Sequence, residues 1–129
     1  MARQFVVQLP NQPGALATLS EALAERGVDL RAIGGGSMGE TGHVIMTTAD
    51  DDTARAVLQA GSYTFVEGES ILAEVGDRPG GMAGVTRELA DAGGNIIGHL
   101  FLGRWGDRAM FTFVVDDADK ARPILERKP

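Results

Sequence analysis

The sequence contains an internal repeat, and this repeat restricts the fold more strongly than any other feature. Residues 11–16 read N-Q-P-G-A-L, and residues 77–82, which lie 66 positions later, read D-R-P-G-G-M. Matching apolar residues follow both Pro-Gly pairs, so the similarity extends beyond the two motifs. A chain of 129 residues that repeats in this way predicts two small units, which we place at residues 1–69 and 70–129. Units of this size are marginally stable alone, so we expect them to support one another.

The first unit shows the periodicities of alternating strands and helices. Residues 4–9 alternate between apolar and polar side chains, which is typical of a strand. Leu16, Leu19 and Leu23 follow the Pro-Gly pair with helical spacing, and Gly27 stands where glycine commonly ends a helix. The predicted order is therefore βαββαβ, with further strands at 29–33, 43–48 and 63–67, a second helix at 53–60 and a turn at 34–42.

The second unit repeats this order but stops before its last strand. The predicted elements are strands at 71–75, 95–102 and 109–115 and helices at 82–92 and from 118 onward. Pro123 lies inside the last helix, which should therefore be short or bent, with a frayed tail. Only three residues separate 63–67 from 71–75, so we expect these two strands to form a hairpin that completes the second sheet.

Composition excludes several classes of function. The net charge is −6, from 12 basic and 18 acidic residues without a basic stripe, which argues against binding to nucleic acid or to an anionic membrane. The absence of cysteine excludes disulfides, thiolate metal sites and cysteine nucleophiles. The N-terminus does not read as a signal peptide and no segment reads as a membrane span, so we expect a cytoplasmic protein.

The two Pro-Gly corners have the chemistry of an amino-acid site. A helix N-terminus presents unpaired N–H groups and favours an anion, and glycine lets a ligand approach the backbone closely. Asn11 and Asp77 lie just before the two corners and offer oxygen atoms to a cation. A carboxylate and an ammonium group a few Å apart describe a free amino acid.

Both units approximate the pattern V-x-L/V-x-[DN]-x-P-G-x-[LM], followed by L-A-x-x-G-V-[DN]-[LI]. This pattern resembles the ACT domain, a module that binds amino acids and regulates aspartate kinases, phosphoglycerate dehydrogenases and other enzymes of amino-acid metabolism. The resemblance implies an α+β fold with two ferredoxin-like βαββαβ units in tandem. Antiparallel sheets with helices on one face are expected, and the last strand of the second unit is missing.

The resemblance also implies a ligand site between two such units, where the corner of one faces a strand of its neighbour. The residues carried over are Asn11, Gln12, Pro13, Gly14 and Ala15 in the first corner, Asp77, Arg78, Pro79, Gly80 and Gly81 in the second, and Asp29 and Asn95 on the strands. A pseudo-twofold axis would bring Asn11 to Asn95 and Asp77 to Asp29. Two facing carboxylates repel each other, so we expect the Asn11/Asn95 pair to form the amino-acid site.

The leading hypothesis is thus a regulatory module that binds a free amino acid, forms a homodimer and regulates a partner enzyme. It needs no cofactor or metal, and no catalytic residues are predicted, because the sequence offers no nucleophile with a matching base. The alternative is an interaction module of the same fold that binds no ligand, in which Asn11 and Asp77 only order their turns.

Three other features have competing interpretations. The acidic clusters 50–52 and 116–119 could suggest a metal, but helix capping explains them better. The glycines at 34, 36 and 39 match a dinucleotide motif, which we reject because a strand and not a helix follows. Ile97, His99 and Phe101 are expected on the outer face of the second sheet, as a dimer interface, while the role of Trp105 stays open.

Overall fold

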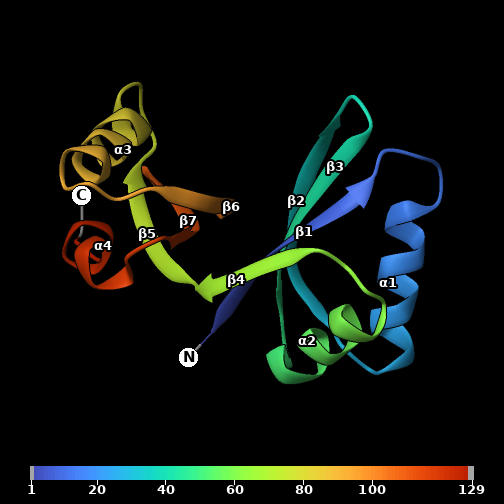
Figure 1. Ribbon diagram of the computed structural model, residues 1–129. Coiled ribbons are helices and arrows are strands. Elements are labelled where there is room, and N and C mark those ends of the chain that lie inside the picture. Colours follow the sequence, from blue (N-terminus) through green and yellow to red (C-terminus); the bar gives the residue numbers. More distant parts are fainter. Residues whose placement is uncertain (1, 128–129) are drawn as a thin grey trace. The chain divides into compact units, whose positions relative to one another are not determined.

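A computed structural model describes residues 2–127, which fold into two compact units, Ala2–Glu67 and a unit beginning at Gly68 (Figure 1). The first unit contains β1 (Arg3–Pro10), α1 (Ala15–Glu25), β2 (Leu30–Met38), β3 (Thr41–Thr48), α2 (Asp51–Ala60) and most of β4 (Phe65–Glu69). Its sheet has the strand order β2-β3-β1-β4, which with two helices gives the predicted βαββαβ pattern.

One face of the first sheet carries the core of this unit. Phe5 and Val7 from β1 and Met46 from β3 are fully buried, with Leu19 of α1 and Leu58 of α2 in the same cluster. Because residues two apart on a strand share a face, both helices must cover the same side of the sheet. The antiparallel pairs of β1 with β3 and of β2 with β3 fix the register.

The second unit contains β5 (Ile71–Gly76), α3 (Gly81–Asp91), β6 (Ile96–Trp105), β7 (Arg108–Val115) and α4 (Ala118–Leu125). Its sheet has the antiparallel order β5-β7-β6, and no fourth strand occurs among the described residues. α4 is short, as the internal Pro123 predicts, with 8 residues against 10 in α2. The frayed tail predicted after it lies at residues 128–129, outside the described part of the chain.

The hairpin predicted between 63–67 and 71–75 is wrong. β4 belongs to the first sheet, where it lies beside β1, and the N–H of Gln8 donates to the carbonyl of Thr64 at 2.9 Å. β5 is an edge strand, with β7 as its only neighbour in the described sheet. The hairpin was predicted because the two strands are close in sequence. In the structure, β4 instead pairs with β1 as the fourth strand of the first sheet.

Ile97 and Phe101 are 42% and 47% exposed, as predicted, but a β-bulge changes the face of the second sheet on which part of this set lies. The register of β6 against β7 shifts between Ile96 and Gly98, so Ile97 is an extra residue in the strand. One extra residue exchanges the two faces of a strand. His99 therefore pairs with Phe113 of the core, but it lies on the edge strand β6 and is itself exposed. A dimer interface at these residues stays a prediction.

Acidic residues cap the two shorter helices, as predicted. A carboxylate oxygen of Asp50 accepts the N–H of Thr53 at 3.1 Å, and one of Asp117 accepts the N–H of Lys120 at 3.2 Å. No helix within residues 2–127 is long and apolar enough to cross a membrane.

The same ion-pair arrangement occurs once in each unit. Arg55 of α2 donates to Glu67 at 2.9 Å and to Asp52 at 2.9 Å. Arg122 of α4 donates in the same manner to Glu69 at 2.9 Å and to an aspartate one turn earlier. Both glutamates belong to β4. Glu67 pairs with α2 in the first unit, and Glu69 pairs with α4 in the second.

The Arg55–Glu67 pair should make the free energy of unfolding depend on pH in the acidic range. The hydrogen bond from Arg55 lowers the pKa of Glu67 below its ordinary value of 4.5, and its carboxylate side chain is only 19% exposed. A lowered pKa contributes stability above pH 4.5 that is lost as the pH falls through the folded-state value. In Glu67→Gln, the free energy of unfolding should fall less steeply below pH 4.5 than in the unmodified chain, as urea titrations at several pH values would measure. Identical slopes would show that this pair contributes nothing.

Candidate functional site

The first Pro-Gly corner is a tight turn that delivers the chain from β1 into α1. The N–H of Gln12 donates to the carbonyl of Pro10 at 3.0 Å, and the N–H of Ala15 donates to that of Gln12 at 3.3 Å. Gly14 precedes the helix with φ 86°, a left-handed conformation that favours glycine, and no side chain caps the helix. Among the first turn of α1, the N–H groups of Leu16 and Ala17 have no acceptor within the described residues.

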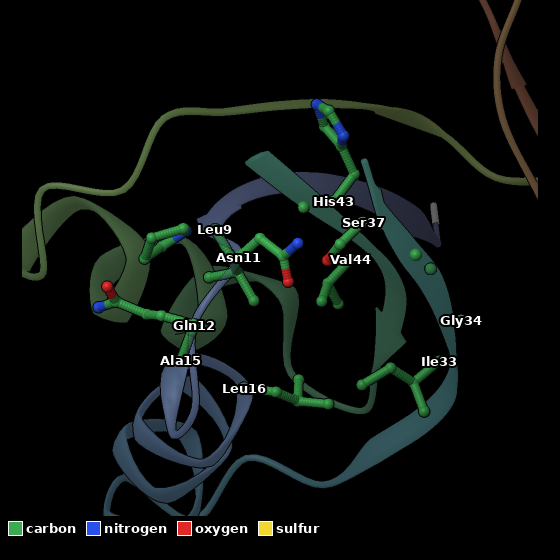
Figure 2. A pocket seen from close by; sticks show the side chains of 14 residues that line it. Leu9, Asn11, Gln12, Ala15, Leu16, Ile33, Gly34, Ser37, His43 and Val44 are labelled. Carbon is green, nitrogen blue, oxygen red and sulfur yellow. The ribbon is translucent and has the colours of Figure 1, made fainter. Parts of the chain in front are cut away.

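Asn11 connects this corner to the hairpin between β2 and β3. Its side-chain Nδ2 donates to the carbonyl of Gly39 at 2.9 Å, and its backbone N–H donates to the carbonyl of Glu40 at 2.9 Å. Its Oδ1 has no hydrogen-bond donor among residues 2–127. Figure 2 shows the amide group of Asn11 pointing into the hollow between β2 and the start of α1.

This hollow is a pocket of about 370 Å³ that lies wholly within the first unit. Its walls come from the end of β1, the corner, the start of α1, and the facing parts of β2 and β3. The lining residues are Leu9, Pro10, Asn11, Gln12, Ala15, Leu16, Ile33, Gly34, Gly35, Gly36, Ser37, Gly42, His43 and Val44. None of them carries an acidic side chain, a lysine or an arginine, so the pocket is neutral and largely apolar.

Gly35 holds the wall of this pocket in place. Its φ is +152°, and a Cβ atom there would lie 2.0 Å from the carbonyl oxygen of His43. Only glycine therefore lets β2 approach β3 at this position. The imidazole of His43 itself points away from Asn11 (Figure 2).

The second corner has the same backbone, but charged side chains of the protein surround it and pair with one another. Gly80 precedes α3 with φ 88°, close to the value at Gly14. The carboxylate of Asp77, however, lies 3.0 Å from Nε of Arg104, and that guanidinium lies 4.8 Å from the centre of the Phe101 ring. The surrounding hollow of about 390 Å³ is lined by Asp77, Arg78 and Arg104 together with apolar residues.

The strand pairings explain why the hollow at the first corner lacks charged side chains and the hollow at the second does not. β1 and β5 both end at their corners, so positions can be counted across the sheet from there. Ser37 pairs with Gly42 in the first unit, and Arg104 pairs with Ala109 in the second. Arg104 therefore occupies the position in β6 that Ser37 occupies in β2. Beyond a second bulge in β6, Phe101 corresponds to Gly35. A serine and a glycine thus stand beside the first corner, whereas an arginine and a phenylalanine stand at the matching positions of the second, where the arginine pairs with Asp77.

The structure gathers only some of the predicted site residues. Asn11, Gln12 and Ala15 line the first pocket, Pro13 and Gly14 shape the turn beside it, and the second corner keeps Asp77, Arg78 and Pro79 around its hollow. Gly80 and Gly81 form the start of α3.

The two predicted strand residues lie far from the corner of their own unit. Asp29 precedes Leu30, which pairs with Thr48 at one end of β3, whereas Pro10 pairs with Thr41 at the other end. Asp29 forms an exposed ion pair with Arg31 at 3.5 Å. Asn95 is exposed, and its backbone N–H donates to Asp116 at 2.8 Å. The pairing of Asn11 with Asn95 and of Asp77 with Asp29 stays a prediction.

Sequence reasoning missed the far wall of the pocket. The stretch 34–42 was predicted as a turn, but β2 continues through Gly34, Gly35 and Gly36 to Met38. Glycine has no side chain to reveal a strand by alternation, which explains the error. The internal repeat could have indicated this strand. Residues 34–36 align with residues 100–102, which read Leu-Phe-Leu and are clearly strand-like.

Comparison with known proteins is consistent with this geometry. Residues 3–60 match the family model of the ACT domain, and no curated protein shows a significant match to the chain. A crystal structure of a protein from Bacteroides thetaiotaomicron aligns with a TM-score of 0.73 at 22% identity, over 97% of this chain and 86% of that one.

Two further structures are regulatory subunits of aspartate kinase. That from Thermus thermophilus, in a ligand-free form, aligns with a TM-score of 0.62 at 22% identity, over 97% of this chain and 87% of that chain. The subunit from Thermus flavus aligns with a TM-score of 0.67 at 18% identity, over 97% of this chain and 88% of that chain. At these identities, the three structures establish that this chain shares their fold.

Proposed function

We propose that this chain, in which residues 3–60 match the family model of the ACT domain, is a regulatory module that binds a free amino acid at its first corner. The observation that carries the proposal is the pocket of about 370 Å³ into which the Asn11 amide points. Ligand pockets for small molecules start at about 300 Å³, so a single amino acid suits this volume.

The polar groups at the corner match the two charged ends of an amino acid. The N–H groups of Leu16 and Ala17, at the positive end of α1, can receive the carboxylate. The free Oδ1 of Asn11 can accept a hydrogen bond from the ammonium group. The second corner is a poorer site, because Arg104 already neutralises Asp77.

We further propose that Asn95 of a second ACT-like unit completes the site, either from this chain or from a second copy in a homodimer. A ligand bound across two units favours the arrangement in which both contact it. Because two of the similar structures are regulatory subunits of aspartate kinase, an enzyme is the proposed partner of this module. A cytoplasmic location accompanies this proposal, since free amino acids and their enzymes meet there.

The proposal is tested by a thermal-shift screen of the free amino acids followed by titration calorimetry. At least one amino acid should raise the melting temperature at millimolar concentration. If none does, the alternative of a ligand-free interaction module is favoured.

Removing either asparagine side chain should weaken binding. Asn11→Ala and Asn95→Ala should each cost about 1–3 kcal/mol, the value of a charge-assisted hydrogen bond lost from an enclosed site. Calorimetry with the amino acid found in the screen would measure the loss, and the melting temperature without ligand would control for folding. Unchanged affinity in Asn95→Ala alone would restrict the site to the first unit, and unchanged affinity in both would refute the assignment.

A further inference from the structure

Two large apolar side chains stand exposed inside the first pocket. Leu16 of α1 is 48% exposed and Ile33 of β2 is 47% exposed, and neither belongs to the core cluster of its unit. Figure 2 shows them facing each other across the lower part of the pocket, from the helix and from the strand. Behind them, Leu9 and Val44 are each only 6% exposed and close the pocket towards the core.

The arrangement separates a polar end from an apolar end. The amide of Asn11 and the first N–H groups of α1 lie at the corner, while the side chains of Leu16 and Ile33 face each other across the lower part of the pocket (Figure 2). An amino acid that places its charged ends at the corner would therefore direct its side chain between Leu16 and Ile33.

Apart from His43, whose imidazole points away from Asn11, the lining contains no side chain that could neutralise a charged ligand side chain. Of its 14 residues, none is acidic, lysine or arginine. A charge moved from water into such surroundings loses hydration without gaining a partner. An apolar ligand side chain, in contrast, should increase the affinity by about fourfold for each methylene group that it removes from water.

We infer that the first pocket selects an amino acid with an uncharged aliphatic side chain, held between Leu16 and Ile33. This inference rests on the proposed function and adds the class of ligand to it. The selectivity belongs to this pocket and not to the corner motif, because the hollow at the second corner is lined by Asp77, Arg78 and Arg104.

Titration calorimetry of the full chain with alanine, valine, leucine, lysine and aspartate tests the inference. Leucine and valine should bind at least about tenfold more tightly than alanine, which follows from two or more additional buried methyl or methylene groups. Lysine and aspartate should bind at least about 100-fold more weakly than leucine, because their charges stay unpaired.

Variants of the wall then identify the contact. Ile33→Ala should reduce the preference for leucine over alanine by about tenfold. Ile33→Asp should raise the affinity for lysine relative to the affinity for leucine. Met38→Ala is the matched control, because Met38 is on the same strand and 88% exposed but does not line the pocket. That variant should leave all affinities unchanged.

The outcomes separate this inference from the proposed function. Tighter binding of lysine or aspartate than of leucine, when it is also weakened by Asn11→Ala, overturns the ligand class but leaves an amino-acid site at the corner. Equal effects of Ile33→Ala and Met38→Ala on leucine also overturn the inference. Absence of binding by every amino acid overturns the proposed function and the inference with it.

Discussion

The double variant Ser37→Arg with Asn11→Asp should lose amino-acid affinity by at least about 100-fold, since it combines loss of a charge-assisted hydrogen bond with an arginine side chain placed over the corner. The two substitutions rebuild in the first corner the pair that occupies the second, where Arg104 lies 3.0 Å from Asp77. Ser37 corresponds to Arg104 by strand register, and Asn11 corresponds to Asp77 by the repeat.

The expected loss has two physical causes. The arginine side chain would extend from β2 over the corner and occupy the volume that the ligand needs. The new carboxylate would be neutralised by that arginine, and so would no longer be available to an ammonium group. The variant chain should keep its fold, because the second unit carries the same pair on the same backbone turn.

Calorimetry with the best amino acid from the screen measures the effect. Met38→Arg is the control, because it adds the same charge one residue further along β2, at a side chain outside the pocket lining. The control should bind nearly as well as the unmodified chain. Full affinity in the double variant would mean that the ligand does not occupy the first corner.

The features that could be predicted from sequence are those with a local cause. Gly14 and Gly80 both have φ values near +87°, at 86° and 88°, so the two Pro-Gly corners can be recognised from the residues alone. The helices after them follow from apolar spacing, and Leu19, Leu23 and Leu89 are buried as that spacing requires, whereas Leu16, predicted on the same face, is 48% exposed.

The features that were missed depend on contacts between distant residues. Nothing near Asp77 in the sequence indicates that Arg104 will neutralise it, because the ion pair forms only when β6 lies beside the corner. The bulges in β6 are likewise invisible to a pattern of strict alternation, and they decide the face on which Phe101 lies. The difference between a corner with a free asparagine amide and a corner with a paired aspartate therefore becomes visible only in the paired strands.

The pocket also depends on a backbone position that no other residue can adopt without strain. Gly35→Ala should destabilise the first unit by about 3 kcal/mol, from a strained backbone and an overpacked contact, each of which costs about 1–3 kcal/mol. The added Cβ would lie 2.0 Å from the carbonyl oxygen of His43, which is backbone and cannot rotate away. β2 would have to separate from β3 to relieve this contact.

Gly36→Ala provides the matched control on the neighbouring residue. A Cβ at Gly36 meets nothing within 4 Å, so the same change should alter stability by less than about 1 kcal/mol. Urea unfolding of the two variants, followed through the whole transition, measures the difference. Both glycines line the pocket, but only the Cβ at Gly35 would push β2 away from β3, so Gly35→Ala should also bind the amino acid more weakly than Gly36→Ala under conditions where both are folded. Equal stability of the two variants would show that β2 can move away from His43 at little cost, and the close approach of the two strands would then not be what keeps the first corner open.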